Sequence, residues 1–175
     1  PALEKIGTLP VIPADPITAY RGRAKLVVSP NGAIGLYDRS GHHDVVDIPG
    51  CRVLAPSLSE VASVLRGLIA SPPAAARPLL LPYDPLGGGV LRAVDLREVY
   101  LPSPRPYEAA TPGAKTLDNE EHLGVLVTFV LQRDRSCSRE ELREAGRAIR
   151  PLLPRVLGVA ANFHDAEAPQ ILGAE

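Results

Sequence analysis

The order of strand-like and helix-like patterns is the feature that most constrains the fold of this chain. Short apolar or alternating runs bounded by turn residues predict three strands, at residues 24–28, 33–37 and 44–48. A helical pattern follows them, and then two strands, a second helix and one more strand. A layer of antiparallel strands with two helices packed on one face satisfies this βββα-ββαβ order. The sequence therefore predicts an α+β fold.

Two capping-box spacings mark the expected helix starts. Ser57 precedes Glu60, and Ser138 precedes Glu141, by the spacing that satisfies free amides at a helix N-terminus. The apolar positions that follow recur with helical periodicity. They are Val61, Val64, Leu65, Leu68 and Ile69 in the first helix, and Leu142, Ala145, Ile149, Leu152 and Leu153 in the second. Each helix should bury this face against the strands.

The second half of the chain repeats the pattern without a residue-level repeat. Strands are predicted at residues 90–100, 124–132 and 156–163, with a short final strand at 168–172 and a helix end at 1–7. Residues 71–89 are expected to be a connector rich in proline and glycine. Residues 98–123 read as a long polar insertion between two strands.

Composition fits one soluble globular domain, or at most two small ones. The chain has 175 residues, of which 22% are charged and 45% apolar. No apolar run reaches the ~18 residues of a membrane span, and no secretion signal opens the chain. Two widely separated cysteines without such a signal indicate a reducing, cytoplasmic location. The net charge of −1 neither favours nor excludes a nucleic-acid partner.

The chain contains no methionine and begins at Pro1. Either an initiator methionine was removed, or the chain is a piece of a longer protein. A free N-terminal proline is the catalytic base of the tautomerase superfamily, whose members begin with a strand. Residues 1–7 have a helical pattern instead, so the sequence gives little support to a small-molecule enzyme that uses Pro1 as its base.

Cations alternate along the first predicted strand. Arg21, Arg23 and Lys25 occupy every second position after Tyr20, and strand geometry places such side chains on one face. A row of cations beside an aromatic ring suits phosphate contacts and base stacking in RNA. A solvated strand face with a tyrosine at the edge of the core gives the same pattern, so the spacing leaves both interpretations open.

A second set of cations lies on the second predicted helix, within a narrow arc away from its apolar face. The set is Arg139, Arg143, Arg147 and Arg150, with Glu140, Glu141 and Glu144 among them. Such a stripe can bind a phosphate backbone. Mixed charge on a helix is more typical of a face that is simply exposed to solvent. The sequence therefore favours a solvent-exposed face over a phosphate-binding stripe at this helix.

The other candidate groups carry weaker signals. His42 and His43 are adjacent, and a strand would point their imidazoles to opposite faces, away from a shared metal ion. Cys51 and Cys137 lack the paired spacing of a zinc site. The glycines at 87–89 precede a strand rather than a helix, which makes them a poor phosphate cradle.

Several stretches carry a family resemblance in their order across nearly the whole chain. They are YRGRAKL at 20–26, IGLY at 34–37, DVVDIPGCRVLAP at 44–56, YD at 83–84, Leu91-Arg92 with Leu96-Arg97, VLGV at 156–159 and ILG at 171–173. In this order they resemble the central domain of the S-adenosylmethionine (SAM)-dependent RNA uracil-C5 methyltransferases that modify 23S rRNA and tRNA. The resemblance implies that residues 1–175 are a single central domain of a larger methyltransferase.

The resemblance also assigns a role to one cysteine. The family's proteins have three cysteines upstream of this domain, and a fourth in the VVDI segment completes a 4Fe–4S site. Cys51 stands at that position. It is therefore expected to be a free thiol in this chain and a cluster ligand in the longer protein. Cys137 matches nothing in the family pattern.

The family's catalytic residues belong to a separate SAM-binding domain, expected after Glu175. There a cysteine attacks C6 of a flipped uracil, C5 takes the methyl group of SAM, and a carboxylate helps to remove the C5 proton. This chain alone is thus expected to bind no cofactor and to catalyse nothing. The implied partners are structured RNA, either rRNA or tRNA, and the flanking domains of the same polypeptide, with no membrane involved.

The residues assigned to RNA contact are Tyr20, Arg21, Arg23, Lys25 and Arg92. One departure from the family is the insertion at 98–123, where the family turns tightly. Its acidic residues outnumber its basic ones, which favours a tolerated surface loop over an RNA clamp. The rival hypothesis is a stand-alone α+β interaction module, descended from the same domain, that binds no RNA.

Overall fold

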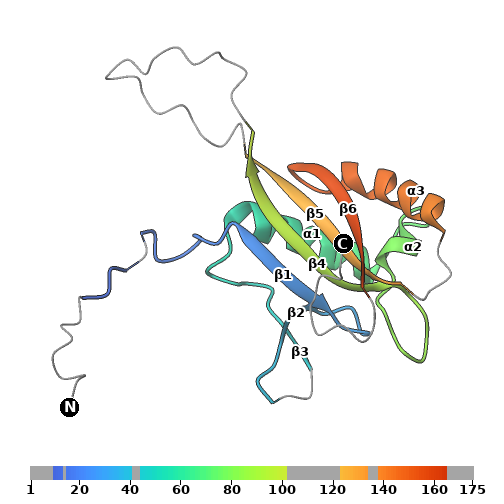
Figure 1. Cartoon of the computed structure of the whole chain (residues 1–175), viewed down its shortest axis with the longest axis horizontal. Helices are drawn as coiled ribbons and strands as arrows, with labels where there is room; N and C mark the ends of the chain where they lie inside the picture. Colours follow the sequence, from blue (N-terminus) through green and yellow to red (C-terminus); the bar gives the residue numbers. More distant parts are fainter. Residues whose placement is uncertain (1–9, 14, 41–43, 102–122, 134–137, 165–175) are drawn as a thin grey trace, which may run out of the picture.

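The computed structural model describes residues 10–13, 15–40, 44–101, 123–133 and 138–164 (Figure 1). Its strands are β1 (Arg23–Val28), β2 (Ile34–Tyr37), β3 (Val45–Asp47), β4 (Leu91–Tyr100), β5 (Leu123–Gln132) and β6 (Val156–His164). Its helices are α1 (Pro56–Ala70), α2 (Arg77–Leu80) and α3 (Arg139–Ile149), with a 3₁₀ turn, η3 (Arg150–Leu152), directly after α3. The predicted α+β fold is confirmed.

The strands form one sheet in the order β3-β2-β1-β4-β5-β6. Every neighbouring pair is antiparallel except β5 and β6, which are parallel. The expectation of a wholly antiparallel sheet is therefore corrected at its last pair. The reason is the helix between them: α3 carries the chain back along the sheet, so that β6 starts at the same end as β5.

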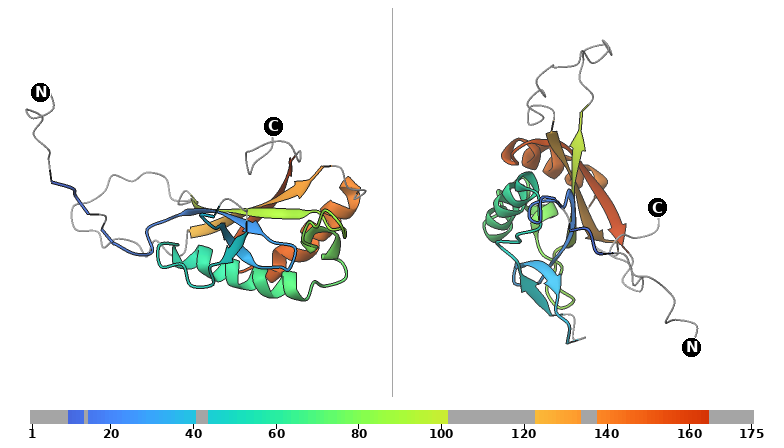
Figure 2. Two further views of the ribbon diagram at one scale, coloured as in Figure 1. Left: turned by 90° about the horizontal axis from the view of Figure 1, so that it is seen from below. Right: turned by 90° about the vertical axis from the view of Figure 1, so that its left-hand side faces the viewer.

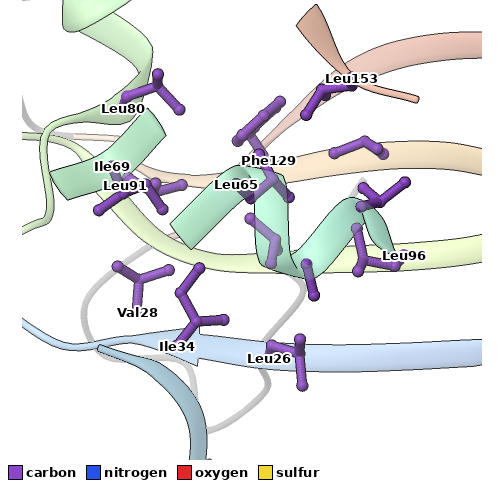
Figure 3. Packing of buried hydrophobic residues seen from close by; sticks show 14 of the residues in the cluster. Leu26, Val28, Ile34, Leu65, Ile69, Leu80, Leu91, Leu96, Phe129 and Leu153 are labelled. Carbon is purple, nitrogen blue, oxygen red and sulfur yellow. The ribbon is translucent and has the colours of Figure 1, made fainter. Parts of the chain in front are cut away.

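All three helices cover one face of the sheet, as Figure 2 shows from two sides. The core lies between these layers. Figure 3 shows Leu65 of α1 beside Phe129 of β5, and the same cluster includes Leu26 and Ile34 of the first strands and Leu96 of β4. Each such side chain, when fully buried, stabilises the fold by about 1.5–3 kcal/mol.

The two predicted capping boxes have different outcomes. Ser138 caps α3 as expected, because its hydroxyl accepts from the Glu141 amide and the Glu141 carboxylate accepts from the Ser138 amide. The capping box predicted at Ser57 is wrong. Helix α1 begins at Pro56, whose fixed φ suits a first helical position. The Ser57 hydroxyl instead donates to the Glu98 carboxylate of β4.

Two predicted connectors contain regular structure. Within residues 71–89 the chain forms the short helix α2, which buries Leu79 and Leu80 in the core. The insertion predicted at 98–123 begins later, because Glu98 to Tyr100 continue β4 and pair with Val125 to Leu123 of β5. The strand predicted at 90–100 is therefore confirmed to its last residue, and the earlier start given to the insertion is wrong. Outside the described residues lie 102–122 of that insertion, the predicted elements at 1–7 and 168–172, and His42, His43 and Cys137.

Helices of the described ranges are all too short or too polar to cross a lipid bilayer.

Candidate nucleic-acid interface

The sheet face opposite the helices carries the predicted row of cations. Ala24 and Leu26 are buried toward the helices, whereas Arg23 and Lys25 alternate with them and remain exposed or partly exposed. The predicted division of this strand into a charged and an apolar face is therefore correct. We call the surface around these two cations the β1 face.

Cross-strand pairing brings β4 residues onto the same face. Arg97 stands opposite Arg23, and Asp95 stands opposite Lys25. Further along, the face becomes apolar, because Val27 and Ala93 are aligned there and both are buried. The accessible part of the β1 face is therefore its charged end.

Arg23 is held in place by Asp95. Its Nε and Nη2 groups donate to the two carboxylate oxygens over 3.1 and 2.7 Å, which is the fork geometry that arginine makes with carboxylates. The hydrogen bonds and charge of Asp95 raise the pKa of Arg23, so the guanidinium stays protonated. The Nη1 group is not engaged in this pair. Arg23 is thus a pre-oriented cation that keeps a donor for another anion.

Arg97 is the residue of this face that the sequence reasoning did not assign to the site. It is exposed and directly opposite Arg23. Like charges opposite each other in a sheet are unfavourable, and Asp95 neutralises only one of the two. A bound phosphate would offset the second charge. The sequence pattern could have placed Arg97 on this face, since Asp95 and Arg97 alternate along their strand in the same way as Arg23 and Lys25.

Tyr20 and Arg21 lie just before β1 and are both exposed. The backbone of Arg21 is paired: its amide donates to Val53 over 2.8 Å, and its carbonyl accepts from Ala55 over 3.0 Å. This pairing places the start of the cation row beside the segment that follows Cys51. It also fixes the backbone from which the Tyr20 and Arg21 side chains project.

Arg92 is not brought together with the other predicted residues. It lies five positions from Arg97 on β4, which corresponds to roughly 17 Å along a strand. Its guanidinium donates to the Gln132 side chain over 2.8 Å and lies 5.1 Å from the centre of the Tyr83 ring. These contacts hold the segment before β4 against the end of β5. The predicted contact set is therefore divided between two ends of the sheet.

Cys51 is a free thiol, partly buried and packed against the core. A 4Fe–4S cluster is held by four thiolates. No group of three or more potential metal ligands occurs among the described residues. These residues do not by themselves form a cluster site.

Comparison with known proteins supports the fold and leaves the sequence family unassigned. No protein-family model and no curated protein matches the sequence. Among solved structures, the chain is similar to the Pyrococcus abyssi tRNA (uracil-54, C5)-methyltransferase in complex with S-adenosyl-L-homocysteine, with a TM-score of 0.54 and 16% sequence identity. The similarity covers 93% of this chain and 31% of that chain. This chain therefore shares its fold with about a third of a tRNA methyltransferase.

Proposed function

We propose that this chain is an RNA-binding domain of an RNA uracil-C5 methyltransferase, corresponding to the central domain of that family. The observation that carries the proposal is the cation arrangement on the β1 face, where Arg23 is oriented by Asp95 opposite the exposed Arg97. Phosphate contacts of this kind position an RNA and carry no base specificity by themselves. Similarity of fold to a tRNA methyltransferase over 93% of the chain supports RNA as the anion.

The proposed role is to hold substrate RNA while other domains methylate it. Tyr20, half exposed at the start of the cation row, is available to stack on an unpaired base. SAM binding and the catalytic groups belong to the proposed remainder of the enzyme. Cys51 as the fourth ligand of a 4Fe–4S cluster in that longer protein remains a prediction, as does a cytoplasmic location.

The proposal is tested by titrating a fluorescein-labelled tRNA transcript with the chain and following fluorescence anisotropy. The double substitution Arg21→Ala with Arg23→Ala should weaken binding at least several-fold, and should reduce the dependence of log K on log salt by about 2. Arg39→Ala with Arg77→Ala is the matched control, since it removes two exposed arginines outside the β1 face. Equal affinity of the Arg21/Arg23 variant and the parent would refute the site.

A further inference from the structure

A groove of about 580 Å³ runs between α3 and β6. One wall is formed by four exposed arginines that project from α3 and the start of η3: Arg139, Arg143, Arg147 and Arg150. The other wall is β6, which is the last strand of the sheet in the described part of the chain. Figure 1 shows α3 running beside β6 at this edge. We call this cavity the α3–β6 groove.

Small residues keep the groove open. On the helix, Gly146 faces β6, and a Cβ added to it would lie 3.9 Å from Val159 Cγ1. On the strand, Gly158, Ala160 and Ala161 line the cavity with little side-chain volume. Phe163 lines the same wall and is partly buried, with one side packed against the core. The groove thus combines a cationic wall with a shallow strand wall that carries one aromatic ring.

The glutamates that lie between these arginines in sequence do not line the groove, although one of them contacts a groove arginine from outside it. Glu141 caps the helix through Ser138, and Glu140 forms an exposed ion pair with Arg143 over 3.5 Å. No acidic residue occurs among the described residues that line the groove. The helix carries both signs of charge in sequence, but the only charged residues on the part of its surface that lines the groove are arginines.

Most of the cationic charge of the groove is not neutralised by the protein. Within the described ranges, Arg139, Arg147 and Arg150 have no ion-pair partner. Positions four apart on a helix lie about 6 Å apart along its axis. Arg139, Arg143 and Arg147 therefore form a regular row of cations, which suits a ligand with regularly repeated negative charge.

We propose that the α3–β6 groove binds the phosphodiester backbone of a single RNA strand, as a second RNA contact separate from the β1 face. The arginines would neutralise successive phosphates, and Phe163 would stack on one base, which is how proteins hold single strands without reading sequence. This inference rests on the proposed RNA-binding function. Strands β4 and β5 lie between β1 and β6 in the sheet, and the groove is on the side that α3 covers, so the two proposed contacts are separate surfaces of the chain.

The test uses the full chain and a fluorescein-labelled unstructured oligouridylate of twelve nucleotides, titrated at several salt concentrations. Arg143→Gln with Arg147→Gln should weaken binding about tenfold at low salt and should lower the salt dependence by about 1.4, since each lost phosphate contact on a single strand contributes about 0.7. The matched control is Arg39→Gln with Arg77→Gln, which should bind as the parent does.

A second variant blocks the groove without changing its charge. Gly146→Leu places a side chain between α3 and β6 and should also weaken oligouridylate binding, with its melting temperature measured to show that it is folded. Unchanged affinity of both variants would overturn the inference. So would displacement of the oligouridylate from the groove by polyglutamate at equal charge concentration, which would assign the groove to an acidic peptide.

The two proposals fail in different ways. Suppose that Arg21→Ala with Arg23→Ala weakens tRNA binding, while Arg143→Gln with Arg147→Gln leaves oligouridylate binding unchanged. The groove inference is then wrong, and the assignment of the β1 face stands. If the α3 variant alone weakens binding, the groove is confirmed and the β1 assignment is wrong. If the parent binds neither tRNA nor oligouridylate, both are wrong.

Discussion

At the residue scale, the Arg23–Asp95 pair links the stability of the sheet to its proposed function. Asp95 is almost fully buried and accepts two hydrogen bonds from Arg23. Arg23 is partly exposed, with 42% of its side-chain surface accessible, so solvent screening reduces what the pair contributes. Asp95 thus orients the cation while leaving part of its surface open to a ligand.

Asp95→Asn should separate these two roles. The amide keeps the size of the side chain but loses the charge that holds Arg23, so the free energy of unfolding should fall by about 1 kcal/mol. The β1 face then gains net positive charge, and RNA binding at low salt should tighten. Urea denaturation and the tRNA titration measure the two effects. An unchanged unfolding free energy together with weaker RNA binding would contradict this description of the pair.

At the element scale, α1 and α3 start by different means although both match a capping box in sequence. In α3 the box forms, and the hydrogen bonds from Ser138 lower the pKa of Glu141. In α1, Ala55 is the N-cap and contributes no side-chain cap. A motif that satisfies helix amides locally can thus be displaced when a neighbouring strand offers its serine another partner.

The capping box of α3 should give a pH-dependent contribution to stability. Ser138→Ala should reduce the free energy of unfolding by about 1 kcal/mol near neutral pH. Because the pKa of Glu141 in the folded chain lies below its ordinary value of 4.5, its part of the stabilisation is complete above that pH and is lost as the pH falls through the folded pKa. The difference in melting temperature between Glu141→Ala and the parent should therefore shrink under acidic conditions. A difference that grows on acidification would contradict the cap.

Two glycines in different elements should respond oppositely to alanine. Gly67 is exposed within α1 and has open space around an added Cβ, so Gly67→Ala should raise the unfolding free energy by about 0.5–1 kcal/mol. Gly35 of β2 is buried, and an added Cβ would lie 1.7 Å from the Val46 carbonyl oxygen of β3. Gly35→Ala should therefore destabilise the chain by more than Gly67→Ala stabilises it. Thermal melts of the two variants compare them directly.

At the scale of the whole molecule, local patterns predicted most of the elements, and long-range packing determined the rest. Strands β1 to β6 and helices α1 and α3 follow from periodicity and turn residues. The parallel direction of β6 does not, because alternation within a strand carries no information about its partner. Helix α2 is too short for periodicity to reveal, and burial of Leu79 and Leu80 in the core accompanies it.

The candidate sites show the same division. The faces of Arg23 and Lys25 followed from strand alternation, and the structure agrees. The separation of Arg92 from Arg97 follows from their spacing of five positions, whereas its contacts with Gln132 and Tyr83 come from the tertiary fold. The α3 arginines were visible as a stripe, but the groove they line exists only because β6 returns beside α3. The charged face of a single helix or strand can be predicted from sequence. The surface that lies opposite that face is determined by the tertiary fold.

The central claim is that this chain binds RNA through fixed cations, and the salt dependence of tRNA binding by the whole chain tests it most directly. If Arg21, Arg23, Lys25 and Arg97 each neutralise one phosphate, the plot of log K against log salt should have a slope of about −3.6, since each contact on a duplex contributes about 0.9. With the groove engaged as well, the slope should be steeper. No measurable binding of tRNA, or binding that does not change with salt, would contradict the account.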